Sequence, residues 1–277
     1  MLDSFHREPA PGSGQEDVSA LLGGGRVSQI ANCIPAPRRR ISSTEAVVIE
    51  RFQVQGKLHR FKNRSEAGKL LSSRLERYKG RQDVRVLALP RGGVPVAFEI
   101  AQALRATLDV FLVRKLGVPG YEELAMGALA SGRVRLLQRD VLDAFHVSPS
   151  TVEAVTETEL RELQRREQLY RGSRSAPDIR DHTVILVDDG LATGSTMRVA
   201  AAAINRQRPK CLIAVVPVAA PQACSKLKAE VDQVICAEMP QTFLSVGSWY
   251  EDFSEVTDDE VREFLAKTDQ NHRAITF

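Results

Sequence analysis

Two adjacent carboxylates, Asp188 and Asp189, stand at the end of the apolar run Val184–Val187 and open a short loop rich in glycine and hydroxyl residues. Glycines let a backbone curl tightly and approach a phosphate closely because they lack a Cβ atom. Hydroxyl side chains and free backbone N–H groups add donors to phosphate oxygens. The loop is therefore suited to hold a phosphate group. Its candidate residues are Gly190, Leu191, Ala192, Thr193, Gly194, Ser195 and Thr196.

The two carboxylates need a partner other than that phosphate, because like charges repel. The vicinal hydroxyl groups of a sugar fit, since their O–H groups donate hydrogen bonds to carboxylates. A ribose 5′-phosphate would satisfy both halves of the pattern. An ordinary Asp-Gly turn before a helix N-cap explains Asp189 and Gly190, but it does not explain two carboxylates followed by a Thr-Gly-Ser-Thr cradle.

A second loop, Pro90-Arg91-Gly92-Gly93, is basic and rich in glycine. It follows the apolar run Val84–Leu89 and precedes the amphipathic stretch Val94–Leu104. A loop between a strand and the start of a helix favours an anion, and an arginine there supplies a charge-assisted donor. The alternative is a tight turn with an exposed arginine.

Elements predicted around these loops place both at one edge of a sheet. Val184–Val187 is typical of a buried parallel strand, and the alanine-rich stretch Met197–Arg206 is typical of a helix with hydroxyl residues at its start. Further strands are expected over Val110–Val113, Leu212–Val218 and Val234–Cys236. Together they predict a doubly wound α/β sheet, and such sheets bind ligands outside the carboxyl ends of their strands.

Residues 183–197, TVILVDDGLATGSTM, resemble the phosphoribosyl-pyrophosphate (PRPP) signature of type I phosphoribosyltransferases: an apolar strand, two acids, a short turn and Thr-Gly-x-Thr. A Walker loop requires a lysine after its last glycine, and this stretch has none. The GxGxxG pattern of dinucleotide sites is missing too. The resemblance covers about residues 61–264 and is closest to bacterial family members of unassigned substrate. It implies a mainly parallel doubly wound fold of the type I kind, with a helical cap insertion at about residues 139–178.

That resemblance implies that Arg91, Gly92 and Gly93 grip the pyrophosphate of PRPP. Family members often carry a cis peptide in this loop, which we expect at Arg91–Gly92.

It also implies that Leu116–Met126 is a mobile loop that closes over PRPP, with Arg114 and Lys115 contacting the pyrophosphate at its base. A lysine at a strand end in water is the alternative for Lys115. Met126–Ala130 and Val134–Leu137 are expected to form a hairpin that returns from the loop.

The implied reaction transfers phosphoribose to a nitrogen of a small acceptor and releases pyrophosphate. Catalysis would be mostly positioning and charge handling, because the transition state resembles an oxocarbenium ion. Asp188 and Asp189 would fix the ribose hydroxyls, and Lys115 would help to neutralise the leaving pyrophosphate. Mg²⁺ would be held by PRPP and water, with no direct protein ligand. Glu122 and Glu123 are the candidate general bases.

Two other classes of function remain to be weighed. A PRPP-sensing regulator could keep the site without transferring anything. Its DNA-binding version would need a helix-turn-helix or a basic recognition helix, and neither is evident. A phosphatase or hydrolase would need a nucleophile or a metal cluster, which the sequence does not display.

Composition sets the remaining limits. The 277 residues suit one large α/β domain over residues 46–277, preceded by a flexible, Gly- and Pro-punctuated extension over residues 1–45. A net charge of +3 is too balanced to indicate nucleic acid binding. The four cysteines have no CxxC spacing, and no apolar run is long enough to span a bilayer. We therefore expect a reduced cytoplasmic protein that binds small molecules. The oligomeric state is not fixed by the sequence, and the resemblance to the family implies a homodimer.

Three stretches receive structural roles. A helix over residues 61–80, capped by Asn63 or Ser65, is expected to pack without any chemistry. The charged helix Pro149–Tyr170 is expected to be a cap or a subunit contact, and Val47–Val54 a short strand. The aromatic residues near the end, Trp249, Tyr250 and Phe253, either stack on a base beside Asp252 or pin the C-terminal helix; the second interpretation is favoured slightly.

Overall fold

A parallel sheet forms the centre of the fold in the computed structural model, which describes residues 48–51 and 60–275. Its strands lie in the order β1-β9-β8-β7-β2-β3, and each neighbouring pair is parallel. The strands are β1 (Val48–Arg51), β2 (Val84–Ala88), β3 (Thr107–Val110), β7 (Thr183–Val187), β8 (Cys211–Val218) and β9 (Gln233–Glu238). The predicted doubly wound sheet is confirmed. The expected extension over residues 1–45 lies outside the described residues.

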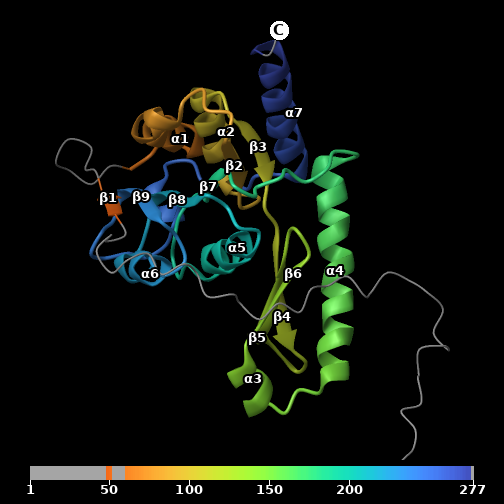
Figure 1. Ribbon diagram of the computed structural model, residues 1–277. Coiled ribbons are helices and arrows are strands. Elements are labelled where there is room, and N and C mark those ends of the chain that lie inside the picture. The colour runs from red at the N-terminus through yellow and green to blue at the C-terminus, as the bar shows by residue number, and fades with distance from the viewer. Residues whose placement is uncertain (1–47, 52–59, 276–277) are drawn as a thin grey trace, which may run out of the picture. The chain divides into compact units, whose positions relative to one another are not determined.

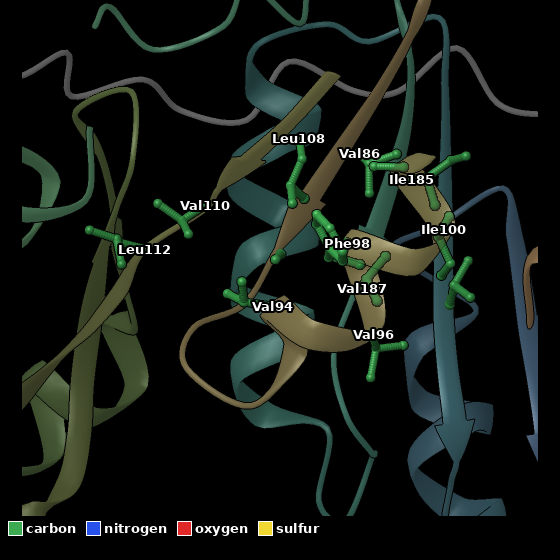
Figure 2. Close-up of a cluster of buried hydrophobic side chains, with 14 of the residues drawn as sticks. Val86, Val94, Val96, Phe98, Ile100, Leu108, Val110, Leu112, Ile185 and Val187 are labelled. Atoms are coloured by element: carbon green, nitrogen blue, oxygen red, sulfur yellow. The ribbon is translucent and has the colours of Figure 1, made fainter. Parts of the chain in front are cut away.

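Helices cover both faces of this sheet (Figure 1). One face carries α1 (Arg64–Ser72), α2 (Gly93–Leu104) and α7 (Asp258–Ile275), and the other carries α5 (Ser195–Arg206) and α6 (Pro221–Leu227). Alternation along the strands explains the two layers, because successive side chains point to opposite faces. In β7, Ile185 packs with α2 in the cluster of Figure 2, whereas Val184 and Leu186 pack with α5. Each such fully buried side chain stabilises the fold by about 1.5–3 kcal/mol.

β2 and β7 are parallel neighbours in the middle of the sheet, and the connections that follow them lead to opposite edges of it. From β2 the chain passes through α2 to β3 on one side, and from β7 it passes through α5 to β8 on the other. Pairing continues past the strand ends, because the Leu89 N–H donates to the Val187 carbonyl at 2.9 Å. The two predicted loops therefore begin side by side at the topological switch point, where open α/β sheets bind ligands.

A second, antiparallel sheet contains β4 (Val113–Val118), β5 (Tyr121–Ala130) and β6 (Val134–Leu137). The hairpin predicted between Met126–Ala130 and Val134–Leu137 is confirmed. The stretch Leu116–Met126, which was expected to be a loop, instead forms most of the β4–β5 hairpin. Its expected mobility stays a prediction. Pro119 and Gly120 make its two-residue turn, with Gly120 at φ +81°. Both ends of the stretch, Leu116 and Met126, are buried.

The strand predicted over Val110–Val113 is also wrong. β3 ends at Val110 and β4 begins at Val113, because the apolar run is divided between two sheets. The Phe111 N–H still donates to the Ala88 carbonyl of β2, whereas the Leu112 N–H donates to Ser131 Oγ in the turn between β5 and β6. Arg114 therefore lies inside a strand of the hairpin and not at the end of a strand of the main sheet.

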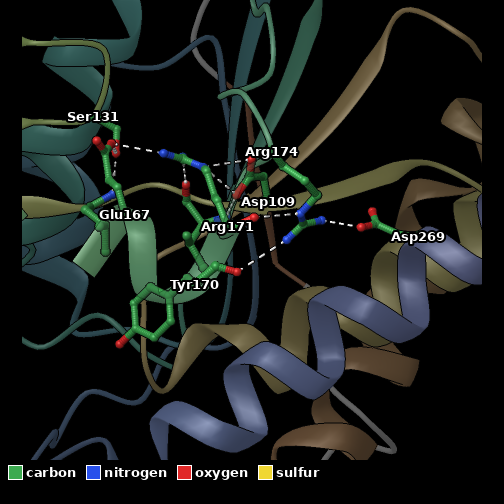
Figure 3. A network of polar contacts seen from close by, with 9 residues as sticks. Asp109, Ser131, Glu167, Tyr170, Arg171, Arg174 and Asp269 are labelled. Atoms are coloured by element: carbon green, nitrogen blue, oxygen red, sulfur yellow. Dashed lines mark hydrogen bonds and ion pairs between the residues drawn. The ribbon is translucent and has the colours of Figure 1, made fainter. Parts of the chain in front are cut away.

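The helical insertion consists of α3 (Arg139–Ala144) and α4 (Pro149–Arg171), close to the predicted bounds. A polar network ties α4 to the main sheet (Figure 3). The Arg171 guanidinium donates to both oxygens of Asp109 in β3 at 3.0 Å and to the Val110 carbonyl at 2.7 Å. It also pairs with Glu167, and Arg174 pairs with Asp269 of α7. Because Arg171 is buried, this network fixes α4 against the sheet and α7.

In the described part of the chain, no helix is long and apolar enough to cross a membrane. Cys211, Cys224 and Cys236 are free thiols, and Cys33 lies outside the described residues.

Candidate active site

The acidic loop after β7 and the basic loop after β2 pack directly against each other. An added Cβ at Gly92 would lie 2.0 Å from Asp189 Oδ2, and one at Gly93 would lie 2.7 Å from the Val187 carbonyl oxygen. Only glycine leaves room for this approach, so the two glycines are required by packing. Asp188 and Asp189 thus lie beside Gly92 and Gly93, although the two motifs are far apart in sequence.

The basic loop contains one cis peptide bond, between Pro90 and Arg91. The expected position, Arg91–Gly92, is wrong by one bond. Gly92 already has helical backbone angles, with φ −59° and ψ −35°, and Gly93 is the first residue of α2. The pair of glycines therefore starts the helix, and the unusual peptide bond precedes it.

Hydroxyl side chains of the predicted phosphate loop are open to solvent. Thr193, Ser195 and Thr196 are exposed, and Thr193 Oγ1 lies 3.2 Å from Ser195 Oγ. Gly194 has φ +76° and forms the N-cap of α5, a left-handed conformation that glycine adopts without strain. The first N–H groups of α5 have no partner within the helix, as at any helix start, so this end is suited to a phosphate.

Leu191 has a different position from the rest of the phosphate loop. Its side chain is buried, its N–H donates to the Val218 carbonyl at 2.9 Å, and its carbonyl accepts from the Ala220 N–H at 2.8 Å. Leu191 therefore anchors the loop to the end of β8, with its N–H already used. The neighbouring Ala192 is exposed.

Both acids of the pair are partly buried and are held by specific contacts. Asp188 Oδ1 accepts from the Asp189 N–H at 2.9 Å, and Asp189 Oδ2 accepts from Arg64 Nε at 2.9 Å. Burial raises the pKa of both carboxyls, and for Asp188 the neighbouring Asp189 charge raises the pKa further. The Arg64 guanidinium opposes this rise in pKa. Among the described residues, Arg64 is thus the one cation that contacts this pair of carboxylates.

Arg64 is a site residue that the sequence analysis missed. It begins α1 directly after the N-cap Asn63, whose side chain accepts from the Glu66 N–H as predicted. That helix was expected to have no chemistry. The signal in the sequence was only an arginine at the start of a helix, where a positive charge is unfavourable for the helix dipole.

A C-terminal strap, defined here as residues 246–255, lies against both loops. An added Cβ at Gly190 would lie 2.4 Å from Val246, and Tyr250 Oη donates to the Asp189 carbonyl at 2.6 Å. Arg64 donates to the Ser254 carbonyl at 2.8 Å, and Glu255 pairs with Arg91.

Tyr250 is buried against Phe61, so its ring packs in the core. Burial raises the pKa of the Tyr250 hydroxyl, so it stays protonated as a donor. Phe253 is 37% exposed and stacks on the Arg64 guanidinium with 3.9 Å to the ring centroid.

Arg114 and Lys115 are committed to neighbours in and beside the hairpin. Arg114 Nε donates to Glu159 Oε2 of α4 at 2.7 Å, and Lys115 Nζ lies 3.0 Å from Glu123 Oε2. Within the described residues, no hydrogen bond or ion pair joins either side chain to the two loops. Their predicted pyrophosphate role thus stays a prediction.

Known proteins share much of this sequence. The model of the phosphoribosyl transferase domain matches residues 55–252. A Mycobacterium tuberculosis (strain H37Rv) protein, provisionally named a phosphoribosyl transferase, is 40% identical over 213 residues, which is 77% of this chain and 47% of that protein. The chain thus spans about half the length of this curated relative.

Among solved structures, that of TT1426 from Thermus thermophilus matches with a TM-score of 0.67 and 39% identity, over 75% of this chain and 98% of that one. The bifunctional protein PyrR of Clostridium acetobutylicum is 30% identical over 140 residues, which is 50% of this chain and 58% of that protein. On the family match, with the two loops meeting at the switch point of the sheet, the chain belongs to the phosphoribosyl transferase domain family.

Proposed function

We propose that this protein transfers the phosphoribosyl group of PRPP to a nitrogen of a small acceptor and releases pyrophosphate. The observation that carries the proposal is the packing of Gly92 against Asp189, which brings the basic loop and the acidic loop to one point of the sheet. A single substrate with a phosphate, a ribose and a pyrophosphate would span both loops. Membership of the phosphoribosyl transferase domain family supports the same substrate.

The 5′-phosphate would bind at the start of α5, where Thr193, Ser195 and Thr196 present exposed hydroxyls. Gly194 would let the backbone N–H groups approach the phosphate oxygens. Leu191 would contribute by anchoring the loop and not by contact with the phosphate.

The ribose hydroxyls would donate to Asp188 and Asp189, whose partly buried carboxylates are held in place before the substrate arrives. In the transition state the sugar ring gains positive charge, and an ionised carboxylate beside it lowers the barrier. The carboxylate that stabilises this positive charge must itself be ionised. Burial of Asp189 favours its protonated form, and the positive charge of Arg64 opposes that effect.

Arg91 would hold the leaving pyrophosphate, with Lys115 and Arg114 as further candidates. The same cations now pair with carboxylates: Glu255, Glu123 and Glu159 respectively. Pyrophosphate would have to replace the carboxylate in each pair that it uses.

Mg²⁺ fits this site as a companion of the substrate. In the described residues, no group of three or more His, Cys, Asp or Glu side chains could hold a metal ion. Mg²⁺ prefers oxygen ligands and commonly keeps substrate phosphates and water among them. It would therefore be held by PRPP oxygens and water, and it would neutralise charge on the pyrophosphate.

A PRPP-binding regulator without transferase activity is the second candidate. The three ion pairs above favour it, because each candidate pyrophosphate cation already has a carboxylate partner. Such a protein would bind PRPP and change conformation without releasing pyrophosphate.

A screen separates the two functions. The full chain is mixed with PRPP, Mg²⁺ and one of a panel of purine, pyrimidine and amine acceptors, while pyrophosphate release is followed. Release with an acceptor supports the transferase, and PRPP binding in calorimetry without release for any acceptor supports the regulator. A chain that does not bind PRPP at all contradicts both.

Asp189→Asn tests the assignment of the ribose. A hydrogen bond to a charged group contributes about 1.5–3 kcal/mol, so PRPP affinity should fall about ten- to a hundredfold in calorimetry. Asp181→Asn is the matched control. Asp181 is exposed and lies just before the first residue of β7, at the end of the strand away from Asp189, and asparagine tolerates its φ of +58°. Equal affinities for the two variants would remove the ribose role.

A further inference from the structure

Arg64 reaches the acidic pair from a helix outside the two loops. It is the first residue of α1, and its side chain is 10% exposed. Its Nε donates to Asp189 Oδ2 at 2.9 Å, across 125 residues of sequence. On the other side, Asp189 Oδ2 faces Gly92, where a Cβ would lie only 2.0 Å away. The carboxylate is thus fixed between a guanidinium and a backbone that cannot move closer.

The same guanidinium is also held by the strap. Its Nη1 donates to the Ser254 carbonyl at 2.8 Å, and its central carbon lies 3.9 Å from the centroid of the Phe253 ring. Tyr250 completes the link by donating to the Asp189 carbonyl at 2.6 Å. An arginine fork suits these several fixed contacts, which a lysine could make only in part.

Charges around Asp189 explain why a cation is needed there. Asp188 adds a second carboxylate next to it, and the Tyr250 hydroxyl is kept neutral by burial. From the strap and α7, Asp252 and Glu260 also experience the charge of Arg64. Arg91 is engaged by Glu255. Arg64 is therefore the cation that contacts the acidic pair within the described residues.

We propose that Arg64 is a positioning residue of the transferase site, which supplies the positive charge beside Asp189, aims its carboxylate and couples it to the strap. Arg64 need not touch the substrate for this role. The inference rests on the proposed function, because it assigns Asp189 to the ribose of PRPP.

The test compares Arg64→Gln, Arg64→Lys and the control Lys69→Gln by PRPP calorimetry across a pH series. Lys69 lies on the same helix with its side chain 71% exposed, so this control removes a charge without touching the site. An arginine beside an aspartate lowers the carboxyl pKa by about one to three units. Removing it should therefore raise the pH below which PRPP affinity is lost by about one to three units.

Arg64→Lys should keep the wild-type pH limit while affinity falls a few-fold, since charge is kept and the fork is lost. The inference is overturned if Arg64→Gln and Lys69→Gln lose affinity at the same pH. A merely structural role would lower affinity equally at every pH.

If Arg64→Gln does not fold, as judged by thermal melting, Phe253→Leu takes its place. It removes the ring that stacks on the guanidinium at a half-exposed position, and it should move the pH limit upward by a smaller amount. No movement in this variant would overturn the inference. Failure of the wild-type protein to bind PRPP at any pH would instead contradict the proposed function.

Discussion

The two loops at the sheet edge and the β4–β5 hairpin were expected to bind one substrate together, yet they are built differently. At the edge, Gly92 and Asp189 leave no room between them, and the phosphate loop keeps its hydroxyls exposed. In the hairpin, Arg114 and Lys115 already pair with Glu159 and Glu123. At the edge, the acidic pair and the phosphate loop are preformed and Arg91 alone has to leave a carboxylate, Glu255, whereas both basic residues of the hairpin must exchange partners before they can bind an anion.

The difference shows which contacts would contribute most to binding. A preformed site loses little entropy in ordering its groups, so each contact with the ligand adds to affinity. When a cation must first leave a carboxylate, its contact with the ligand contributes only the difference in free energy between the new ion pair and the old one. We therefore expect changes at the edge to alter PRPP affinity strongly, and changes in the hairpin to act more on turnover or on stability.

Gly92→Ala should have the largest effect. Its methyl group would take the space of Asp189 Oδ2, so the carboxylate must turn away from both Arg64 and the substrate. PRPP affinity should fall about a hundredfold in calorimetry, as expected for the loss of charged hydrogen bonds.

Gly120→Ala is the matched change in the hairpin turn. A methyl group there meets no atom within 4 Å, but the φ of +81° makes it strained. It should lower the free energy of unfolding by about 1 kcal/mol and leave PRPP affinity unchanged. Equal losses of affinity in the two glycine variants would abolish the contrast between edge and hairpin.

The edge could be predicted from sequence because its geometry is local. Strand, loop and helix follow one another in the chain at both motifs, and parallel strands place their carboxyl ends together. Asp188, Asp189 and Gly194 therefore occupy the positions that the spacing indicated. The cis bond was misplaced by one residue because two glycines mark a loop without marking which bond is unusual.

The rest depends on residues far apart in sequence. The partner of Asp189, Arg64, lies in a helix that has ordinary packing signals, and Glu159 of α4 is 45 residues from Arg114. The hairpin was mistaken for a loop because Pro119-Gly120 resembles the middle of a loop. In a strand–turn–strand it is a complete connection, and the flanking buried residues decide between the two.

Lys115→Ala and Arg114→Ala should distinguish the roles of two adjacent basic residues. Their effects are expected to be smaller than that of Gly92→Ala. Lys115 is exposed with its glutamate, so its loss should change the free energy of unfolding by no more than about 0.5 kcal/mol. If it contacts pyrophosphate, turnover should fall about tenfold, as for one lost charged contact.

Arg114 is half-buried against α4, so its loss should lower the free energy of unfolding by about 1–3 kcal/mol. Chemical denaturation and pyrophosphate release measure the two quantities. Wild-type turnover in Lys115→Ala would show that the hairpin lysine does not serve the reaction.

Glu255→Gln should have the smallest effect and the opposite sign. Glu255 pairs with Arg91 while its side chain is 74% exposed, so it competes with pyrophosphate only weakly. Exposed ion pairs contribute little, so removal of this carboxylate should tighten binding of pyrophosphate by no more than about fivefold. The gain should shrink as salt is added, because exposed charges are screened.

Glu251→Gln is the control. Glu251 is an exposed acid of the same strap, so this substitution removes the same charge from another position. Calorimetry with pyrophosphate at low and high salt measures both variants. Weaker binding in Glu255→Gln alone would mean that the carboxylate orients Arg91 for the anion. In that case Arg91, the exposed cation of the edge, would also be positioned before the anion binds. The contrast between the edge and the hairpin would then be sharper than the ion pairs indicate.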